Sequence, residues 1–288
     1  CMPSVAIMDD IDDSGVELLR QEGFEVLERE GFENADAIIV RSATKVNREF
    51  IDRCKNLKLI VRAGVGLDNI DVEYAKSKGI EVRNTPRATS ISVAELTVGL
   101  MLSALRMIPY AHSSTKAGKW EKKSLKGREI YGKVVGLVGL GNIGLEVAKR
   151  CEAFGAEIVY YDVVDRGVYK RLEFGELFET ADIVSLHLPL TDETRGIINY
   201  PLLMRLKEQA VIVNTARGEL IPTDDLVRFL KERRDVIAAL DVFESEPPPK
   251  EILELDNVIL TPHIGAQTKE AQLRASTEAA RIIIEFFK

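Results

Sequence analysis

The sequence predicts an α/β protein of two domains, each built around a doubly wound parallel sheet. Short runs of apolar, β-branched residues alternate with helical patterns along the chain, which is typical of βαβ units. The chain has 288 residues, which is long for one core and enough for two domains that each bury most of their apolar surface. We therefore expect two sheets, each covered by helices.

The first series of strands and helices occupies the part of the chain before Pro86. Its strands are expected at residues 4–8, 24–28, 35–40, 57–64 and 80–84. Helical patterns at 14–23 and 47–56 lie between them. Ser14 is a suitable N-cap for the first helix, and Gly23 stands where a helix C′ residue is expected. The first series therefore ends near Pro86.

A long helix is predicted from Ser92 to about Ala111. Its apolar residues cover most of its circumference, as they do in a helix buried between larger bodies. We interpret this helix as the bridge between the two domains.

A second alternating series follows the bridge. Its strands are expected at residues 133–140, 156–162, 181–188, 210–216, 236–242 and 257–262. The helix at 223–235 has Thr223 as a suitable N-cap, acidic residues in its first turn and basic residues in its last. Residues 269–288 form a final amphipathic pattern.

The composition argues against nucleic-acid-binding, membrane and disulfide-rich proteins. Acidic residues outnumber basic ones by 46 to 39, so a nucleic-acid-binding face is not expected. Neither a signal peptide nor an apolar run of about 18 residues is present, so we expect a soluble, cytoplasmic protein that does not bind membranes. Cys1, Cys54 and Cys151 are widely spaced and predict neither disulfides nor a metal site. Whether Cys1 is native is left open.

One glycine motif predicts a cofactor. Gly139, Gly141 and Gly144 form GxGxxG directly after an apolar strand, and the helix that they open begins with Asn142 and Ile143. The glycines permit a tight turn, a close approach of the backbone to a pyrophosphate, and close packing of helix on strand. The alternative is a glycine-rich turn without a ligand.

The next strand ends in Asp162, about 20 residues after the glycines, where a carboxylate accepts hydrogen bonds from an adenosine ribose. Because a carboxylate repels a 2′-phosphate, the pattern favours NAD over NADP, although Arg166 is near. His187 also ends a strand and is expected to line the cofactor site.

Three reactive side chains follow strands of the second series: Arg217, Glu246 and His263. Imidazole titrates near neutral pH, so His263 could take the hydroxyl proton while a hydride leaves a 2-hydroxy acid. Glu246 would orient the ring, and the planar guanidinium of Arg217 could hold and polarise a substrate carboxylate or carbonyl. The alternative for His263 is a strand-end histidine that is satisfied by a backbone carbonyl.

Four motifs, "VGLVGLGNIG", "NTARGE", "ALDVFESEP" and "TPHIG", resemble those of the D-2-hydroxyacid dehydrogenase family, and the resemblance covers nearly the whole chain. It implies that Arg217, Glu246 and His263 are the catalytic set. It also implies that Asp241 lies near the nicotinamide carboxamide, and it is consistent with Thr215 as a further cofactor-binding residue.

The resemblance further implies the domain arrangement. A Rossmann-type NAD-binding domain, residues 96–267, would be inserted into a flavodoxin-like substrate domain made of residues 1–95 and 268–288. A homodimer is also implied. The sequence stops soon after the final helix, so we expect no regulatory domain of the kind that ends many relatives, and no feedback inhibition by serine through one.

Within the family, "RAGVGLDNID" and "NTPRATSISVAEL" most resemble D-3-phosphoglycerate dehydrogenases, which begin serine synthesis. By this resemblance Arg41 and Arg62 would meet a substrate phosphate. Backbone amides around Ala63, Gly64 and Val65 would hold the substrate carboxylate.

Two alternatives stay open. Glyoxylate and hydroxypyruvate reductases share the catalytic motifs but generally lack the arginine that precedes "AGVG", here Arg62. A non-catalytic NAD-binding regulator is the other alternative, because some relatives act as transcriptional corepressors. Turnover would separate this last class from the enzymes.

Overall fold

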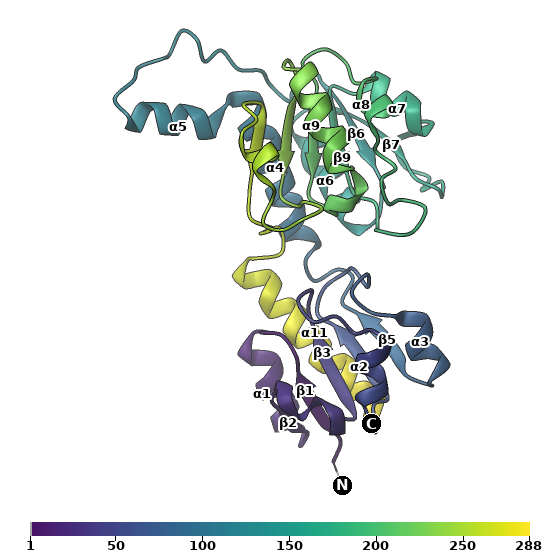
Figure 1. Cartoon of the computed structure of the whole chain (residues 1–288). Helices are drawn as coiled ribbons and strands as arrows, with labels where there is room; N and C mark the ends of the chain where they lie inside the picture. Colours follow the sequence, from purple (N-terminus) through teal and green to yellow (C-terminus); the bar gives the residue numbers. More distant parts are fainter. Residues whose placement is uncertain (1) are drawn as a thin grey trace. The chain divides into compact units, whose positions relative to one another are not determined.

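The computed structural model describes residues 2–288, so Cys1 lies outside the described residues. The chain divides into two compact units (Figure 1). The first unit contains the chain up to Ser92 together with Ala266–Lys288, and the second contains Val93–Gly265. The chain leaves the first unit within α4 (Ser90–Arg106) and returns to it after Gly265.

The first unit contains a five-stranded parallel sheet in the order β2-β1-β3-β4-β5. Its strands are β1 (Ser4–Ile7), β2 (Glu25–Leu27), β3 (Ala37–Val40), β4 (Leu59–Arg62) and β5 (Glu81–Asn84). Its helices are α1 (Asp13–Gln21), the 3₁₀ helix η1 (Arg29–Asn34), α2 (Arg48–Arg53), α3 (Val72–Ser77) and α11 (Lys269–Phe287). This is the flavodoxin-type strand order, which changes direction between β1 and β3.

Helix α11 completes the core of the first unit, although it lies at the far end of the chain. The Ser276 hydroxyl donates to the Asp12 carbonyl at 2.5 Å and accepts from the Gly15 N–H at 3.1 Å. A Cβ on Gly15 would lie 2.2 Å from this hydroxyl oxygen, so only glycine permits the close crossing of α1 and α11. Ala279 and Ile283 of α11 are fully buried in the same apolar cluster as strand residues of β1, β3 and β4.

Two predicted helix caps are wrong by one or two residues. Asp12, not Ser14, caps α1, because the Asp12 carboxylate accepts from both the N–H and the hydroxyl of Ser14. Thr223 is the first residue of α9 (Thr223–Glu232) and follows Pro222, whose fixed φ suits the entry to a helix. Gly23 follows α1 with φ of 88°, which confirms its predicted place as the C′ residue.

The second unit contains a seven-stranded parallel sheet in the order β12-β11-β10-β9-β6-β7-β8, the Rossmann order with a further strand at one edge. Its strands are β6 (Val134–Val138), β7 (Glu157–Tyr161), β8 (Lys170–Arg171), β9 (Ile183–Leu186), β10 (Val211–Asn214), β11 (Ile237–Leu240) and β12 (Val258–Leu260). Besides α4 and α9, its elements are α5 (Ile108–Lys116), α6 (Asn142–Ala153), α7 (Phe174–Thr180), α8 (Tyr200–Leu203), η2 (Gly218–Leu220) and α10 (Lys250–Leu253). The expected α/β class with two parallel sheets is confirmed, while β8 was not anticipated.

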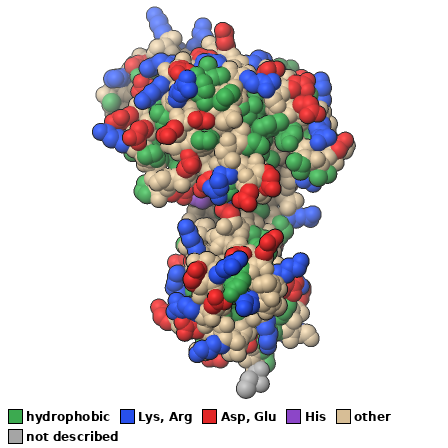
Figure 2. All heavy atoms as spheres, turned by 45° about the vertical axis from the view of Figure 1, so that its right-hand side comes forward, with side chains coloured by type: hydrophobic (Ala, Val, Ile, Leu, Met, Phe, Trp, Pro, Cys, Tyr) green, Lys and Arg blue, Asp and Glu red, His purple; other side chains and the backbone are tan. Residues whose placement is uncertain are grey.

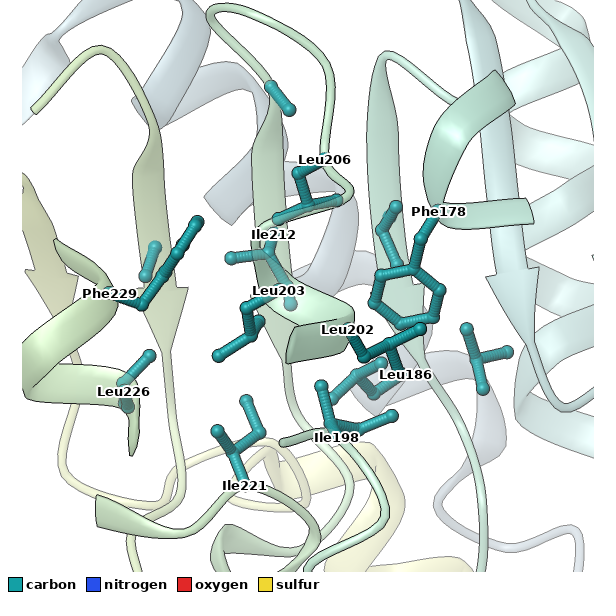
Figure 3. Close-up of a cluster of buried hydrophobic side chains, with 14 of the residues drawn as sticks. Phe178, Leu186, Ile198, Leu202, Leu203, Leu206, Ile212, Ile221, Leu226 and Phe229 are labelled. Carbon is teal, nitrogen blue, oxygen red and sulfur yellow. The ribbon is translucent and has the colours of Figure 1, made fainter. Parts of the chain in front are cut away.

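Each face of the second sheet contributes to its own apolar cluster, because successive strand side chains point to opposite faces. Ile212 packs with residues of α7, α8 and α9, such as Phe178 and Phe229 (Figure 3). Its neighbours Val211 and Val213 pack with residues of α4 and α6 on the other face. Both faces are therefore covered by helices.

The single bridge helix predicted from Ser92 to Ala111 is wrong, because the helix breaks at Met107. Met107 has φ of 54°, and Pro109 lacks an N–H to continue the helix and would clash with the carbonyl of Leu105. That carbonyl instead accepts from the N–H of Arg128 at 3.0 Å.

Among residues 2–288, no single helix combines the length and apolar character needed to cross a membrane, and only α4 and α5 together, bent by 62°, meet that criterion. Acidic and basic side chains are interspersed over the face shown in Figure 2.

Candidate active site

The glycine turn lies where the strand order of the second sheet reverses, between β6 and β9. The His187 N–H donates to the Val138 carbonyl at 2.7 Å across this point. Gly139 has φ of 97°, and a Cβ there would lie 2.5 Å from the His187 carbonyl oxygen. A Cβ on Gly144 would lie 2.5 Å from the Gly139 carbonyl oxygen. Packing within the protein therefore requires glycine at both positions.

Gly141 is different, because a Cβ on it would meet no described atom within 4 Å. It is the N-cap of α6, which begins with Asn142 and Ile143 as expected. Open space beside helix N-terminal amides is what a dinucleotide pyrophosphate needs. Since packing does not explain this glycine, the turn fits the predicted cofactor.

Asp162 directly follows β7 and is 6% exposed. Its carboxylate accepts from the N–H groups of Leu140 (2.9 Å) and Val164 (3.2 Å), and the Arg166 Nε lies 3.3 Å away. Desolvation raises the pKa of Asp162, but these two N–H donors and Arg166 outweigh it and hold the pKa below its usual value. Asp162 is therefore ionised at neutral pH.

His187 and Thr215 also lie at strand ends of the second unit. The His187 Nε2 is 2.8 Å from the Ser185 hydroxyl, and burial lowers the pKa of His187 to about 3. This imidazole is therefore neutral at physiological pH and is a poor proton carrier. The Thr215 hydroxyl lies 2.8 Å from that of Thr97. Cofactor contact by either residue stays a prediction.

The three reactive side chains follow β10, β11 and β12, which are neighbours in the sheet. The His263 Nδ1 lies 2.9 Å from the Glu246 Oε2, and both side chains are about two-fifths exposed, at 42% and 41%. The other Glu246 oxygen accepts from the Phe243 N–H at 3.3 Å. Glu246 can thus orient the imidazole while the His263 Nε2 makes no hydrogen bond to any residue of the described chain.

Arg217 is brought to the same edge by a close backbone contact. A Cβ on Gly218 would lie 1.9 Å from the Phe243 carbonyl carbon, so the loops after β10 and β11 touch through this glycine. Asn214 is buried and braces the turn, since its side-chain amide donates to the Arg217 carbonyl at 3.0 Å and its Oδ1 accepts from the Ala216 N–H at 3.1 Å. The guanidinium of Arg217 donates to the Ala216 carbonyl at 2.8 Å.

The Asp241 carboxylate accepts three hydrogen bonds from the loop that contains His263. One carboxylate oxygen accepts from the Thr261 hydroxyl (2.7 Å) and the Ile264 N–H (2.8 Å), and the other accepts from the Gly265 N–H (2.9 Å). His263 has φ of 54°, a left-handed conformation that needs support from its surroundings. Asp241 supplies that support, and its predicted contact with nicotinamide stays a prediction.

In the first unit, Arg41 and Arg62 lie at the carboxyl ends of neighbouring strands β3 and β4. The Arg41 N–H donates to the Asp9 carboxylate at 2.6 Å, and its Nη1 donates to the Asp10 carbonyl at 3.2 Å. The Arg62 Nη1 donates to the Gly66 carbonyl at 2.8 Å. Both arginines are partly buried and are held by their loops.

The expectation that the amides of Ala63, Gly64 and Val65 all hold a carboxylate needs correction. The Ala63 N–H donates to the Val40 carbonyl, and the Gly64 N–H donates to the Thr85 hydroxyl at 2.8 Å. These two donors are already used within the protein. The N–H of Val65 donates to no described residue, and its contact with a substrate carboxylate stays a prediction.

Sequence reasoning missed Asn214, Gly218 and Thr261, which support the reactive loops. An asparagine at the end of a strand often hydrogen-bonds the backbone two residues on, so Asn214 carried a usable signal. Gly218 and Thr261 carried none, because their partners Phe243 and Asp241 are 20 or more residues away in sequence.

Comparison with known proteins identifies a family of dehydrogenases. Residues 98–265 match the family described as "D-isomer specific 2-hydroxyacid dehydrogenase, NAD binding domain". A hydroxypyruvate reductase from Thermotoga maritima is 51% identical over 257 residues, which cover 87% of this chain and 84% of that protein.

A D-3-phosphoglycerate dehydrogenase from Methanocaldococcus jannaschii is 51% identical over 259 residues, which cover 87% of this chain and 49% of that protein. The chain thus spans about half the length of this relative. The crystal structure of NAD⁺-bound 3-phosphoglycerate dehydrogenase from Entamoeba histolytica is similar with a TM-score of 0.86 and 34% identity, covering 100% of this chain and 96% of that chain.

Proposed function

The chain belongs to the D-isomer specific 2-hydroxyacid dehydrogenase family and carries its NAD-binding domain, and we propose that it interconverts D-3-phosphoglycerate and 3-phosphohydroxypyruvate. The observation that carries the choice of substrate is the position of Arg62, at the end of the strand next to that of Arg41. Guanidinium groups bind phosphate and carboxylate through paired hydrogen bonds, so two of them suit a substrate that has both groups.

The reactive loops of the second unit would carry out the proton transfer. His263, whose Nδ1 is held by Glu246, would accept the C2 hydroxyl proton at Nε2 during oxidation and return it during reduction. Arg217 would orient the substrate and polarise its carbonyl. When bound, NAD supplies the hydride acceptor at its nicotinamide C4. Glu246 would stabilise the imidazolium that forms after oxidation.

A second function is favoured by one comparison. The Thermotoga relative named hydroxypyruvate reductase is as similar as the phosphoglycerate dehydrogenase and is matched over 84% of its length. Reduction of hydroxypyruvate or glyoxylate would use the same three residues without a phosphate contact. A non-catalytic NAD-binding regulator is the remaining alternative, and it requires the absence of turnover on all of these ketones. We also propose a cytoplasmic homodimer that acts in serine synthesis.

Replacement of Arg62 by alanine separates the two enzyme functions. We expect kcat/KM for 3-phosphohydroxypyruvate to fall about tenfold to a hundredfold, because a charge-assisted contact to the phosphate is lost. Turnover of glyoxylate should change little. NADH consumption on both ketones measures the effect. Arg53→Ala, which removes an exposed arginine paired with Glu33 in the same unit, is the control. Equal losses on both ketones would contradict a phosphate contact.

Asp162 should determine the preference for NAD over NADP. Asp162→Asn removes the negative charge at almost constant size and leaves Arg166 in place. We expect the ratio of NADPH to NADH dissociation constants to fall at least about tenfold, because a like-charge contact with the 2′-phosphate is relieved. Quenching or enhancement of nicotinamide fluorescence measures both constants without turnover. Adding Arg166→Ala should reverse the gain, and an unchanged ratio in Asp162→Asn would refute this role.

A further inference from the structure

Asn69 connects the two arginine loops of the first unit through one side chain. Its amide nitrogen donates to the carbonyls of Arg41 and Thr44, each at 2.7 Å. Its amide oxygen accepts from the Arg62 Nη1 at 3.1 Å. All three polar positions of the side chain, two N–H donors and one oxygen, therefore have a partner.

The loop from Arg41 to Thr44, which is hydrogen-bonded to Asn69, is also hydrogen-bonded to Asp9. The Asp9 carboxylate accepts from the N–H of Arg41 and from the N–H and hydroxyl of Thr44. The Val46 N–H donates to the Asn69 carbonyl at 2.8 Å, which joins the two segments through their backbones as well. The backbone beside Arg41 is thus held by hydrogen bonds from both Asp9 and Asn69.

Neither aspartate nor alanine would reproduce this arrangement. Aspartate would keep an acceptor for Arg62 but would lose both donors to the loop, and alanine would lose all three contacts. If Asn69 only held the loop from Arg41 to Thr44 in place, its contact with the Arg62 guanidinium would not be needed. The oxygen of Asn69 instead faces Arg62, the residue on which the choice of substrate rests.

We propose that Asn69 is a positioning residue, which sets the Arg62 guanidinium relative to Arg41 so that the pair receives the anionic groups of the substrate. This inference rests on the proposed function. A long side chain that is held in place before binding loses less conformational freedom when the ligand arrives, so affinity improves without a new contact to the ligand.

A double-mutant cycle tests whether Asn69 acts through Arg62. Asn69→Ala should raise the KM for 3-phosphohydroxypyruvate about tenfold and leave kcat within about twofold. The NADH dissociation constant should stay unchanged, because the glycine turn and Asp162 belong to the second unit. In an Arg62→Ala background, Asn69→Ala should add little. Asn69→Asp should raise KM at least as much as Asn69→Ala, because its carboxylate would repel the substrate phosphate and the carbonyls of Arg41 and Thr44.

The control is Asn47→Ala, which removes the N-cap of α2 in the same unit and should lower the melting temperature without raising KM. An equal KM increase from Asn69→Ala with and without Arg62 would overturn the inference, as would a lower melting temperature with unchanged KM. If the wild type reduces glyoxylate but not the phosphorylated ketone, the proposed function fails. The inference on Asn69 then fails with it, whereas reduction of the phosphorylated ketone without coupling between Asn69 and Arg62 overturns the inference alone.

Discussion

His263→Asn is expected to lower kcat by about a thousandfold, because it removes the group proposed to carry the substrate proton. Asparagine is the suitable replacement, since His263 has φ of 54° and asparagine accepts the left-handed conformation more readily than most residues. The loop held by Asp241 should therefore keep its shape. Steady-state reduction of the preferred ketone measures the loss.

Binding of NADH should be unchanged in His263→Asn, which serves as the control for an intact cofactor site. Glu246→Gln should reduce kcat less, because the imidazole stays in place and only the charge beside it is lost. A kcat of His263→Asn within tenfold of the wild type would show that another group moves the proton. His187 is not that group, since burial lowers its pKa to about 3.

Gly218→Ala is expected to have the largest effect on stability. The added Cβ would lie 1.9 Å from the carbonyl carbon of Phe243, so the backbone of one loop must move. Forcing extra volume into such a contact costs about 1–3 kcal/mol or more in the free energy of unfolding. Because Phe243 donates to Glu246, the movement should also disturb the Glu246–His263 pair and lower kcat. Thermal unfolding and kinetics measure the two effects.

The matched control is Gly99→Ala in the same unit. Gly99 is exposed within α4, and a Cβ there would meet no described atom within 4 Å. Alanine is favoured over glycine in a helix by up to about 1 kcal/mol, so this variant should be neutral or slightly more stable. Similar melting temperatures for Gly218→Ala and Gly99→Ala would refute the steric argument.

Features that depend on neighbours in sequence could be predicted. The strand, glycine turn and helix around Gly139 are confirmed, because each part has its own local pattern. Arg217, Glu246 and His263 were placed after strands by the same reasoning, and those strands prove to be adjacent in one sheet.

Features that depend on distant partners could not be predicted. The contact of Asn69 with Arg41 spans 28 residues, and nothing local marks it. The amides of Ala63 and Gly64 were expected to be available, but strand β3 and Thr85 occupy them. The break at Met107 is different, because Pro109 marks it locally; it was missed because the apolar pattern continues through it.

The position of α11 has a consequence for synthesis on the ribosome. The first unit takes its last core residues, including Ala279 and Ile283, from the end of the chain. Its five strands are made first, but α1 supplies only part of the cover for the sheet face that α11 completes, and α11 is made more than 180 residues after β5. The second unit has its whole core within Val93–Gly265 and can fold earlier. Part of that face therefore stays exposed on the nascent chain until α11 is made, and of the two units the one that begins first should finish folding second.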